Sequence, residues 1–264
     1  MPACADLQAW GAGMKLFGYR VPMMASLLLW CVVWEIVGRL DLVFLLPPFS
    51  SVLAAAVDLV QTHSWQSATV TTLRAFVIGM ALSIVVGIPL GILMGRVKLA
   101  DELLGMWVNI FSSAPLSALV PVLMILFGFG EKTIVAAVFL FAIWIIVLDT
   151  RAGVRHISPS LVEMARSYGA SRRALYAKII LWAALPEILA GIRLGLIRGV
   201  KGVVIGQLLV AIVGYGALFE TFSRNFRMAE FWALTIILFA FALLVAELIE
   251  KVEAKVEFYA GARQ

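Results

Sequence analysis

The sequence predicts an all-α, polytopic membrane protein with about six transmembrane helices. Hydrophobic residues account for 63% of its 264 residues and the mean hydropathy is +1.02, whereas soluble domains are nearer half apolar. A helix of about 20 apolar residues crosses the hydrocarbon core of a bilayer and satisfies its own backbone hydrogen bonds there. Runs such as IVAAVFLFAIWIIVL lack the apolar and polar alternation of a barrel strand. We therefore expect helices rather than a barrel.

Apolar stretches of the required length occur at roughly residues 21–38, 72–95, 103–127, 133–148, 187–213 and 231–249. They predict a transmembrane domain over residues 21–250, with one tail over 1–20 and another over 251–264. The first stretch is followed by Glu35, Arg39 and a proline pair rather than by a signal-peptide cleavage site. We expect it to be retained as a helix.

The distribution of lysine and arginine predicts the orientation, because loops that hold these residues stay in the cytoplasm. If the amino terminus is inside the cell, the outer loops hold only Arg39, Lys132, Arg224 and Arg227. Both termini and the polar segment 151–186 are then cytoplasmic. Membrane insertion explains the net charge of +5, so we expect no nucleic-acid partner.

Cysteine and histidine give no sign of a disulfide framework or a metal site. Cys4 and Cys31 are too few for such a framework. His63 and His156 lie on opposite sides of the membrane in this topology and lack ligand spacing. We expect no bound metal.

Prolines mark two irregular segments. After the first span, LLPPFSSVLAAAVDLV predicts a turn and then a short outer helix with Ser50 or Ser51 as N-cap. The third span should bend, because Pro115 and Pro121 each remove an intrahelical hydrogen bond. That bend is either a packing kink or the mark of a helix that lines a solute pathway, where freed carbonyls face water.

The polar segment 151–186 predicts a helix, a turn and a second helix. Ser158 or Ser160 can cap the first helix, which would hold Glu163 in its first turn. Gly169 can end that helix in left-handed geometry. Ser171 can then cap the second helix, and Pro186 marks the start of the fifth span. Such a helix pair suits a docking lever, although a solvated amphipathic loop would show the same pattern.

The fifth span carries a stripe of small residues. Five glycines recur every three or four positions and fall on one side of a helix with 100° per residue: Gly191, Gly195, Gly199, Gly202 and Gly206. Glycines at this spacing let two helix backbones approach closely. The stripe predicts a packing seam, either with another helix of this chain or with a second copy.

Cations lie on the other side of the same span. Charges within a membrane are costly, so they usually face a cavity, a partner or, by snorkelling, the interface. Arg193 is near enough to the end of the span to snorkel. Arg198 and Lys201 are deeper, and they predict a basic patch in a pathway for an anionic solute. Pairing with Glu187 or other carboxylates near helix ends is the structural alternative.

The polar segment resembles the EAA signature of permease subunits in ATP-binding-cassette (ABC) importers. The glutamate, alanine and glycine of that signature correspond to Glu163, Ala165 and Gly169, followed by Ile179 and Leu181. The stretches LLPPFSS and APLSALVPVLMILFGFG also resemble blocks of nitrate, sulfonate and taurine importer permeases. Two positions depart from the pattern: Trp182 replaces a proline, and Gln207 replaces a glutamate common in the fifth span.

The resemblance implies that this chain works as one of several different subunits. It implies that two copies of the chain form the pore in a bacterial cytoplasmic membrane, that each engages one of two ATP-binding subunits, and that an extracytoplasmic solute-binding protein delivers the solute. The contact with the ATPase would involve Glu163, Ala165, Arg166, Gly169, Ala170 and Ser171, and the pathway Pro115, Pro121, Arg198, Lys201 and Gln207. This chain has no G-x-x-x-x-G-K-[ST] phosphate loop. ATP and Mg²⁺ would therefore be bound by the partner ATPase, and this chain would hold no cofactor.

Two other classes of function remain open at this point. A carrier driven by an ion gradient usually places carboxylates or histidines well inside its spans and often shows inverted repeats. Here Glu35, Asp149, Glu187 and Glu247 are near predicted helix ends. An intramembrane enzyme needs a nucleophile and base, or a metal set, at membrane depth. Neither histidine lies there.

Overall fold

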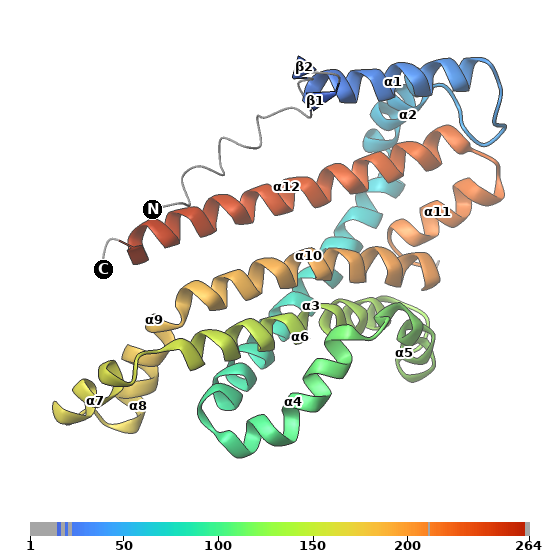
Figure 1. The fold of residues 1–264 in the computed structure, drawn as a ribbon. Coiled ribbons are helices and arrows are strands. Elements are labelled where there is room, and N and C mark those ends of the chain that lie inside the picture. Colours follow the sequence, from blue (N-terminus) through green and yellow to red (C-terminus); the bar gives the residue numbers. More distant parts are fainter. Residues whose placement is uncertain (1–14, 17–18, 21–22, 211, 262–264) are drawn as a thin grey trace. The chain divides into compact units, whose positions relative to one another are not determined.

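The computed structural model describes residues 15–16, 19–20, 23–210 and 212–261 (Figure 1). It is helical apart from two short strands, β1 (Lys15–Leu16) and β2 (Tyr19–Arg20), which pair antiparallel with Lys15 opposite Arg20. The rest of the predicted tail over 1–20, with Cys4, lies outside the described residues. The chain divides into two compact units: Met1–Thr62 with Phe222–Ile236, and His63–Thr221 with Ile237–Gln264.

The smaller unit contains α1 (Met23–Arg39), α2 (Phe49–Gln61) and the first turns of α12 (Met228–Gly261). The helix α2 starts directly after Pro48, and neither Ser50 nor Ser51 caps it, which corrects the prediction. The Glu35 side chain performs this role instead. Its Oε2 accepts a hydrogen bond from the backbone N–H of Ser50 at 2.9 Å, and its Oε1 accepts from the Ser50 hydroxyl at 2.9 Å.

Indole groups hold the proline turn of the smaller unit. Trp34 Nε1 donates to the carbonyl of Pro47 at 3.0 Å, and Trp232 Nε1 donates to that of Leu45 at 2.9 Å. The two rings also meet edge to face, with centroids 5.3 Å apart. Tryptophan suits this position because its ring is apolar and its N–H needs an acceptor.

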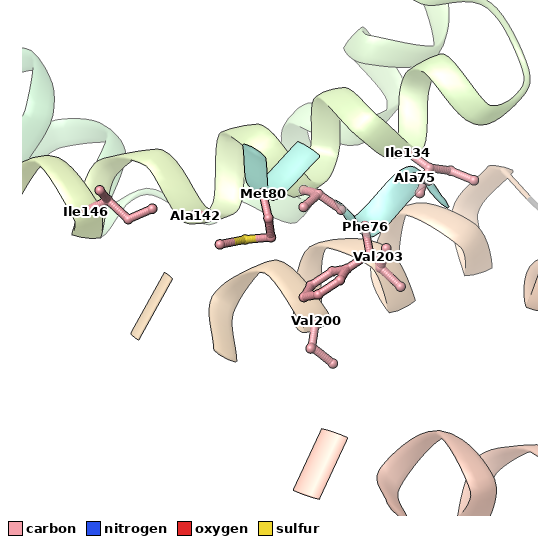
Figure 2. Packing of buried hydrophobic residues seen from close by; sticks show 9 residues of the cluster. Ala75, Phe76, Met80, Ile134, Ala142, Ile146, Val200 and Val203 are labelled. Carbon is pink, nitrogen blue, oxygen red and sulfur yellow. The ribbon is translucent and has the colours of Figure 1, made fainter. Parts of the chain in front are cut away.

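The larger unit is built around α6 (Glu131–His156), which packs between α3 (His63–Arg96) and α10 (Leu185–Val210). Figure 2 shows Phe76 and Met80 of α3 between α6 and α10 in this core. The unit also contains α4 (Lys98–Ser113), η2 (Leu116–Leu119), α5 (Val120–Phe127), α7 (Pro159–Ser167), α8 (Arg172–Leu175), η3 (Tyr176–Ile180), α9 (Leu181–Ala183), most of α11 (Tyr215–Arg224) and the later part of α12.

Glycines allow close contact of α6 with both α10 and α3. A Cβ added to Gly191 would lie 2.9 Å from the Cβ of Asp149, and one added to Gly202 would lie 3.1 Å from that of Phe141. The stripe of the fifth span therefore packs within the same chain, mainly on α6, with Gly199 lying nearest to Met80 of α3. The helix α3 presents a second stripe, in which Gly79 and Gly91 lie against Val138 and Thr150 at 2.6 Å by the same measure. The two stripes let the backbones of α3 and α10 approach α6 closely, while Phe76 and Met80 of α3 fill space between α6 and α10.

The helix limits differ from the predicted spans at several places. The second span starts at His63 rather than at residue 72, and the sixth continues to Gly261 rather than ending at residue 249. The fourth span does not end at residue 148, because α6 continues to His156. The third span is not one bent helix: α4 and the segment Leu116–Phe127 meet at 97°. Among the described residues, α3 and α6 are long and apolar enough to cross a membrane. Up to four helices or helix pairs qualify if each bent pair counts as one span.

Candidate functional site

The turn after α7 has the geometry expected from Gly169. This residue has a φ of +76°, which a residue with a side chain rarely adopts. The Gly169 N–H donates to the carbonyl of Arg166 at 2.9 Å, and the Ala170 N–H donates to that of Ala165 at 3.0 Å. These two bonds form a Schellman motif. The prediction that Gly169 ends the helix is confirmed.

A second helix begins at once after this turn. The Ser171 hydroxyl accepts from the Ala174 N–H at 3.3 Å and caps it, as predicted. The helix runs through α8, η3 and α9, with a π-helical segment at Tyr176–Ile180. It then meets α10 at 64°, next to Pro186. We call residues 157–184, which include α7, α8, η3 and α9, the elbow (Figure 1).

The elbow has a hydrophobic core of its own. Val162 and Ala165 of α7 are buried together with Leu175 and Ile180 of the second helix. The same cluster includes Val154 of α6 and Ile188 of α10. The elbow is thus packed against both long helices rather than tethered to them as a loop.

The opposite face of the elbow is open to solvent. Glu163, Arg166 and Gly169 are exposed, and Tyr168 at the tip is 87% exposed. Glu163 lies in the second turn of α7, not the first, because Pro159 occupies the first helical position. The hydroxyl of Ser158 caps no backbone group; it shares a hydrogen bond with Ser160 at 2.6 Å. Tyr168 was not among the predicted site residues. Its position directly before the turn glycine could have indicated an exposed aromatic side chain, a residue type common at interface hot spots.

The two prolines of the third span lie at a helix break. Pro115 precedes η2, and Pro121 lies in the first turn of α5, where its missing N–H has no intrahelical partner to lose. Both are exposed. The sharp angle therefore comes from the non-helical residues at Ala114 and Pro115.

Arg198 of α10 reaches the same break. Its Nη1 donates to the backbone carbonyl of Ser112 at 3.4 Å, in the last turn of α4. A cation is favourable there because the carbonyls at a helix C-terminus carry partial negative charge. Lys201, three residues further along α10, is exposed and neighbours Arg198 on the helix surface. The structure thus brings Pro115, Arg198 and Lys201 into one region.

Gln207 differs from the expectation that it lines a pathway. Its side chain is 1% exposed, and its Nε2 donates to Thr72 Oγ1 of α3 at 2.7 Å. The turn at Gly214 and Gly216 packs directly on it. In this conformation Gln207 joins α10 to α3 and does not reach a surface.

Comparison with known proteins identifies the family. Residues 87–257 match the family described as binding-protein-dependent transport system inner membrane component. The chain belongs to this family. This permease is 28% identical over 219 residues to the taurine transport system permease protein TauC of Escherichia coli (strain K12), which covers 80% of this chain and 78% of TauC. It is 32% identical to a probable ABC transporter permease protein of Brucella melitensis, over 65% of this chain and 70% of that protein.

Solved structures agree on the fold. The MetNI methionine ABC transporter in an inward-facing conformation superposes with a TM-score of 0.61 at 19% identity, over 73% of this chain and 96% of that chain. The prediction of an all-α importer permease is therefore confirmed. This protein is a membrane permease subunit of an ABC importer rather than an ion-gradient-driven carrier. Importer permeases of this kind work with ATPase and binding-protein partners.

Proposed function

We propose that two copies of this chain form the membrane pathway of an importer for a small anionic solute, and that each elbow docks on one ATP-hydrolysing subunit. The solute is of the taurine, sulfonate or nitrate kind, delivered by an extracytoplasmic binding protein to a multi-pass pore in a bacterial inner membrane. The ATP-hydrolysing subunits bind ATP and Mg²⁺. The observation that carries this proposal is the elbow, which has an exposed tip and a core shared with α6 and α10.

The elbow suits the transmission of force. A docking surface needs exposed side chains of the kinds found at protein interfaces, and Tyr168, Arg166 and Met164 provide them. A lever needs a stiff connection to the parts that move. The buried contacts of Val162 and Ile180 with Val154 and Ile188 supply that connection. A rigid-body tilt of the elbow would then move α6 and α10 together.

The region around Arg198 supports an anionic solute. Discontinuous membrane helices present polar groups to a solute, and here two cations, Arg198 and Lys201, accompany the helix break. Among the relatives, TauC is named for taurine, and SsuC of Escherichia coli, 33% identical over 53% of each chain, for aliphatic sulfonates. The proposed pathway residues are Pro115, Pro121, Arg198 and Lys201. Gln207 instead supports α10 through its contact with α3.

The docking role is tested with Glu163→Arg in the complete transporter. The variant should fold, because Glu163 is exposed, yet ATPase copurification and solute uptake should each fall about tenfold or more, as for loss of an interface hot spot. Glu102→Arg is the matched control, since Glu102 is an exposed carboxylate of α4 outside the elbow. Normal copurification and uptake in Glu163→Arg would exclude docking through α7.

The solute class is tested by uptake into proteoliposomes that contain the binding protein. Lys201→Gln should reduce uptake of taurine, a sulfonate or nitrate by about fivefold, as expected for the loss of one cation near an anion at about 1 kcal/mol. Lys132→Gln, which removes an exposed cation at the start of α6, should not. A cation as the only ligand of the binding protein would refute the anion assignment.

A further inference from the structure

A polar cavity lies beside the elbow, between the last turns of α3 and α6 and the first part of α7. Its volume is about 460 Å³, and its lining includes Arg96, Arg155, Glu163 and Arg166. The exposed face of the elbow described above borders it only through Glu163 and Arg166. The cavity is therefore a feature separate from the tip at Tyr168.

The charges around this cavity do not cancel. Three guanidinium groups face one carboxylate in the lining. Arg155 also shares Asp101 of α4 with Arg151, at 3.3 Å from its Nη1 to Asp101 Oδ2. Within the described chain, Arg96 and Arg166 have no ion-pair partner; Arg96 is half-buried, whereas Arg166 is exposed. A partly desolvated arginine without an anionic partner is unfavourable, and the single carboxylate of Glu163 leaves the lining with an excess of positive charge.

The position of the cavity along the membrane indicates the source of that group. Among the described residues, α3 and α6 are the unbroken helices long and apolar enough to cross a bilayer, and Arg96 and Arg155 lie in their last turns. These ends are adjacent, because a Cβ on Gly95 would lie 2.7 Å from the Cβ of Val154. The excess of cations at these ends predicts the cytoplasmic face. Basic pockets between membrane helices on that face bind anionic lipid head groups.

We propose that this cavity binds a phosphate group, supplied by the head group of an anionic phospholipid or by free inorganic phosphate. Arg96 and Arg155 hold it from the two spans and Arg166 holds it from α7. Bound phosphate neutralises the guanidinium groups and ties the elbow to the ends of α3 and α6. The inference does not depend on the proposed docking role of Glu163, because lipid binding is measured on this chain without an ATPase.

Native mass spectrometry of the full-length chain in neutral detergent tests the proposal, with phosphatidylglycerol and phosphatidylcholine titrated in parallel. Phosphatidylglycerol should bind more tightly, and Arg96→Gln should weaken it about fivefold, the effect of one surface cation on an anionic lipid. Lys98→Gln is the matched control, because Lys98 is two residues away, pairs with Glu102 and does not line the cavity. If Arg96→Gln fails to fold, Arg166→Gln takes its place.

A second measurement distinguishes a lipid head group from free inorganic phosphate as the source of the bound phosphate. A rise in the melting temperature with inorganic phosphate, at constant ionic strength against chloride and lost in Arg96→Gln, would assign the site to a free anion. Tight phosphatidylglycerol binding without that rise would assign it to lipid. Equal binding of both lipids with no phosphate effect, or equal losses in Arg96→Gln and Lys98→Gln, would overturn the proposal. So would a loss of ATPase copurification in Arg96→Gln with lipid binding unchanged, which would assign the cavity to the ATPase.

Discussion

Gly169 is the residue on which the shape of the elbow depends most directly. Its left-handed φ of +76° allows both hydrogen bonds of the Schellman turn to form. Gly169→Ala should therefore destabilise this turn by about 1–2 kcal/mol, whereas Gly169→Asn should cost less, because asparagine tolerates this conformation. No side chain blocks either substitution, since nothing lies within 4 Å of the added Cβ.

Hydrogen exchange of the backbone amides at residues 165–171 measures this difference. Exchange should be fastest in Gly169→Ala, intermediate in Gly169→Asn and slowest in the native chain. Equal rates in all three proteins would show that the turn does not depend on the conformation of Gly169.

Local chemistry explains which residue roles were predictable. Gly169 and Ser171 act on backbone groups within five residues of themselves, so the sequence contains the whole interaction. The cap of α2 comes from Glu35, fifteen residues before Ser50. No local pattern reveals such an acceptor. Glu163 lies one turn later in the helix than predicted, because Pro159 starts the helix before Ser160 can cap it.

At the scale of elements, the contact between α3 and α6 makes the sharpest prediction. Gly91→Val would place a Cβ 2.6 Å from the Cβ of Thr150, in contact with side chain and backbone on α6. The helices would have to separate, which should lower the free energy of unfolding by about 1–3 kcal/mol. Thermal unfolding in detergent would show a lower midpoint.

Gly105→Ala in α4 is the matched control for this substitution. The nearest atoms to its added Cβ are 3.8 Å away, an ordinary contact, and they belong to the flexible Arg151 side chain. Alanine favours a helix over glycine by about 1 kcal/mol, so the midpoint should stay or rise. An equal fall in both variants would indicate that close packing on α6 is not the cause.

The helices and the stripe on the fifth span were predictable, but the partner of the stripe was not. Periodicity shows which face of a helix is small, and it says nothing about what lies opposite. The stripe on α3 is not among the predictions, although its glycines Gly79, Gly87, Gly91 and Gly95 are spaced by multiples of four, with Ser83 midway between the first two. The break at Pro115 was foreseen as a bend, and its full angle depends on the residues around Ala114, where the chain leaves the helix.

At the scale of the whole molecule, the shared core of elbow, α6 and α10 predicts motion as one body. Spin labels at Ser167→Cys and Ala152→Cys, with the native cysteines replaced by serine, should give one narrow distance. That distance should be the same with and without ATP in the reconstituted transporter, because Val162 and Val154 share a buried cluster. Double electron–electron resonance measures it.

The same experiment contains its own positive control. A single label at Ser167→Cys reports the distance between two copies, and this distance should change when ATP binds if the elbows tilt with the ATPases. An intrachain distance that broadens with ATP would mean that the elbow moves on a flexible hinge instead. Whole-molecule properties of this kind, including the pairing of copies, could not be derived from the sequence, because they depend on surfaces whose partners it does not contain.

The two glycine stripes that meet α6 also determine which substitutions the chain tolerates. At each of these sites the smallest side chain is already in use, so exchange can only add volume. Saturation mutagenesis should therefore show two periodic series of positions that tolerate no substitution, one along α3 and one along α10, with a spacing of about four residues. Exposed apolar residues between these glycines, such as Val85 of α3 and Leu194 of α10, should tolerate exchange among apolar types.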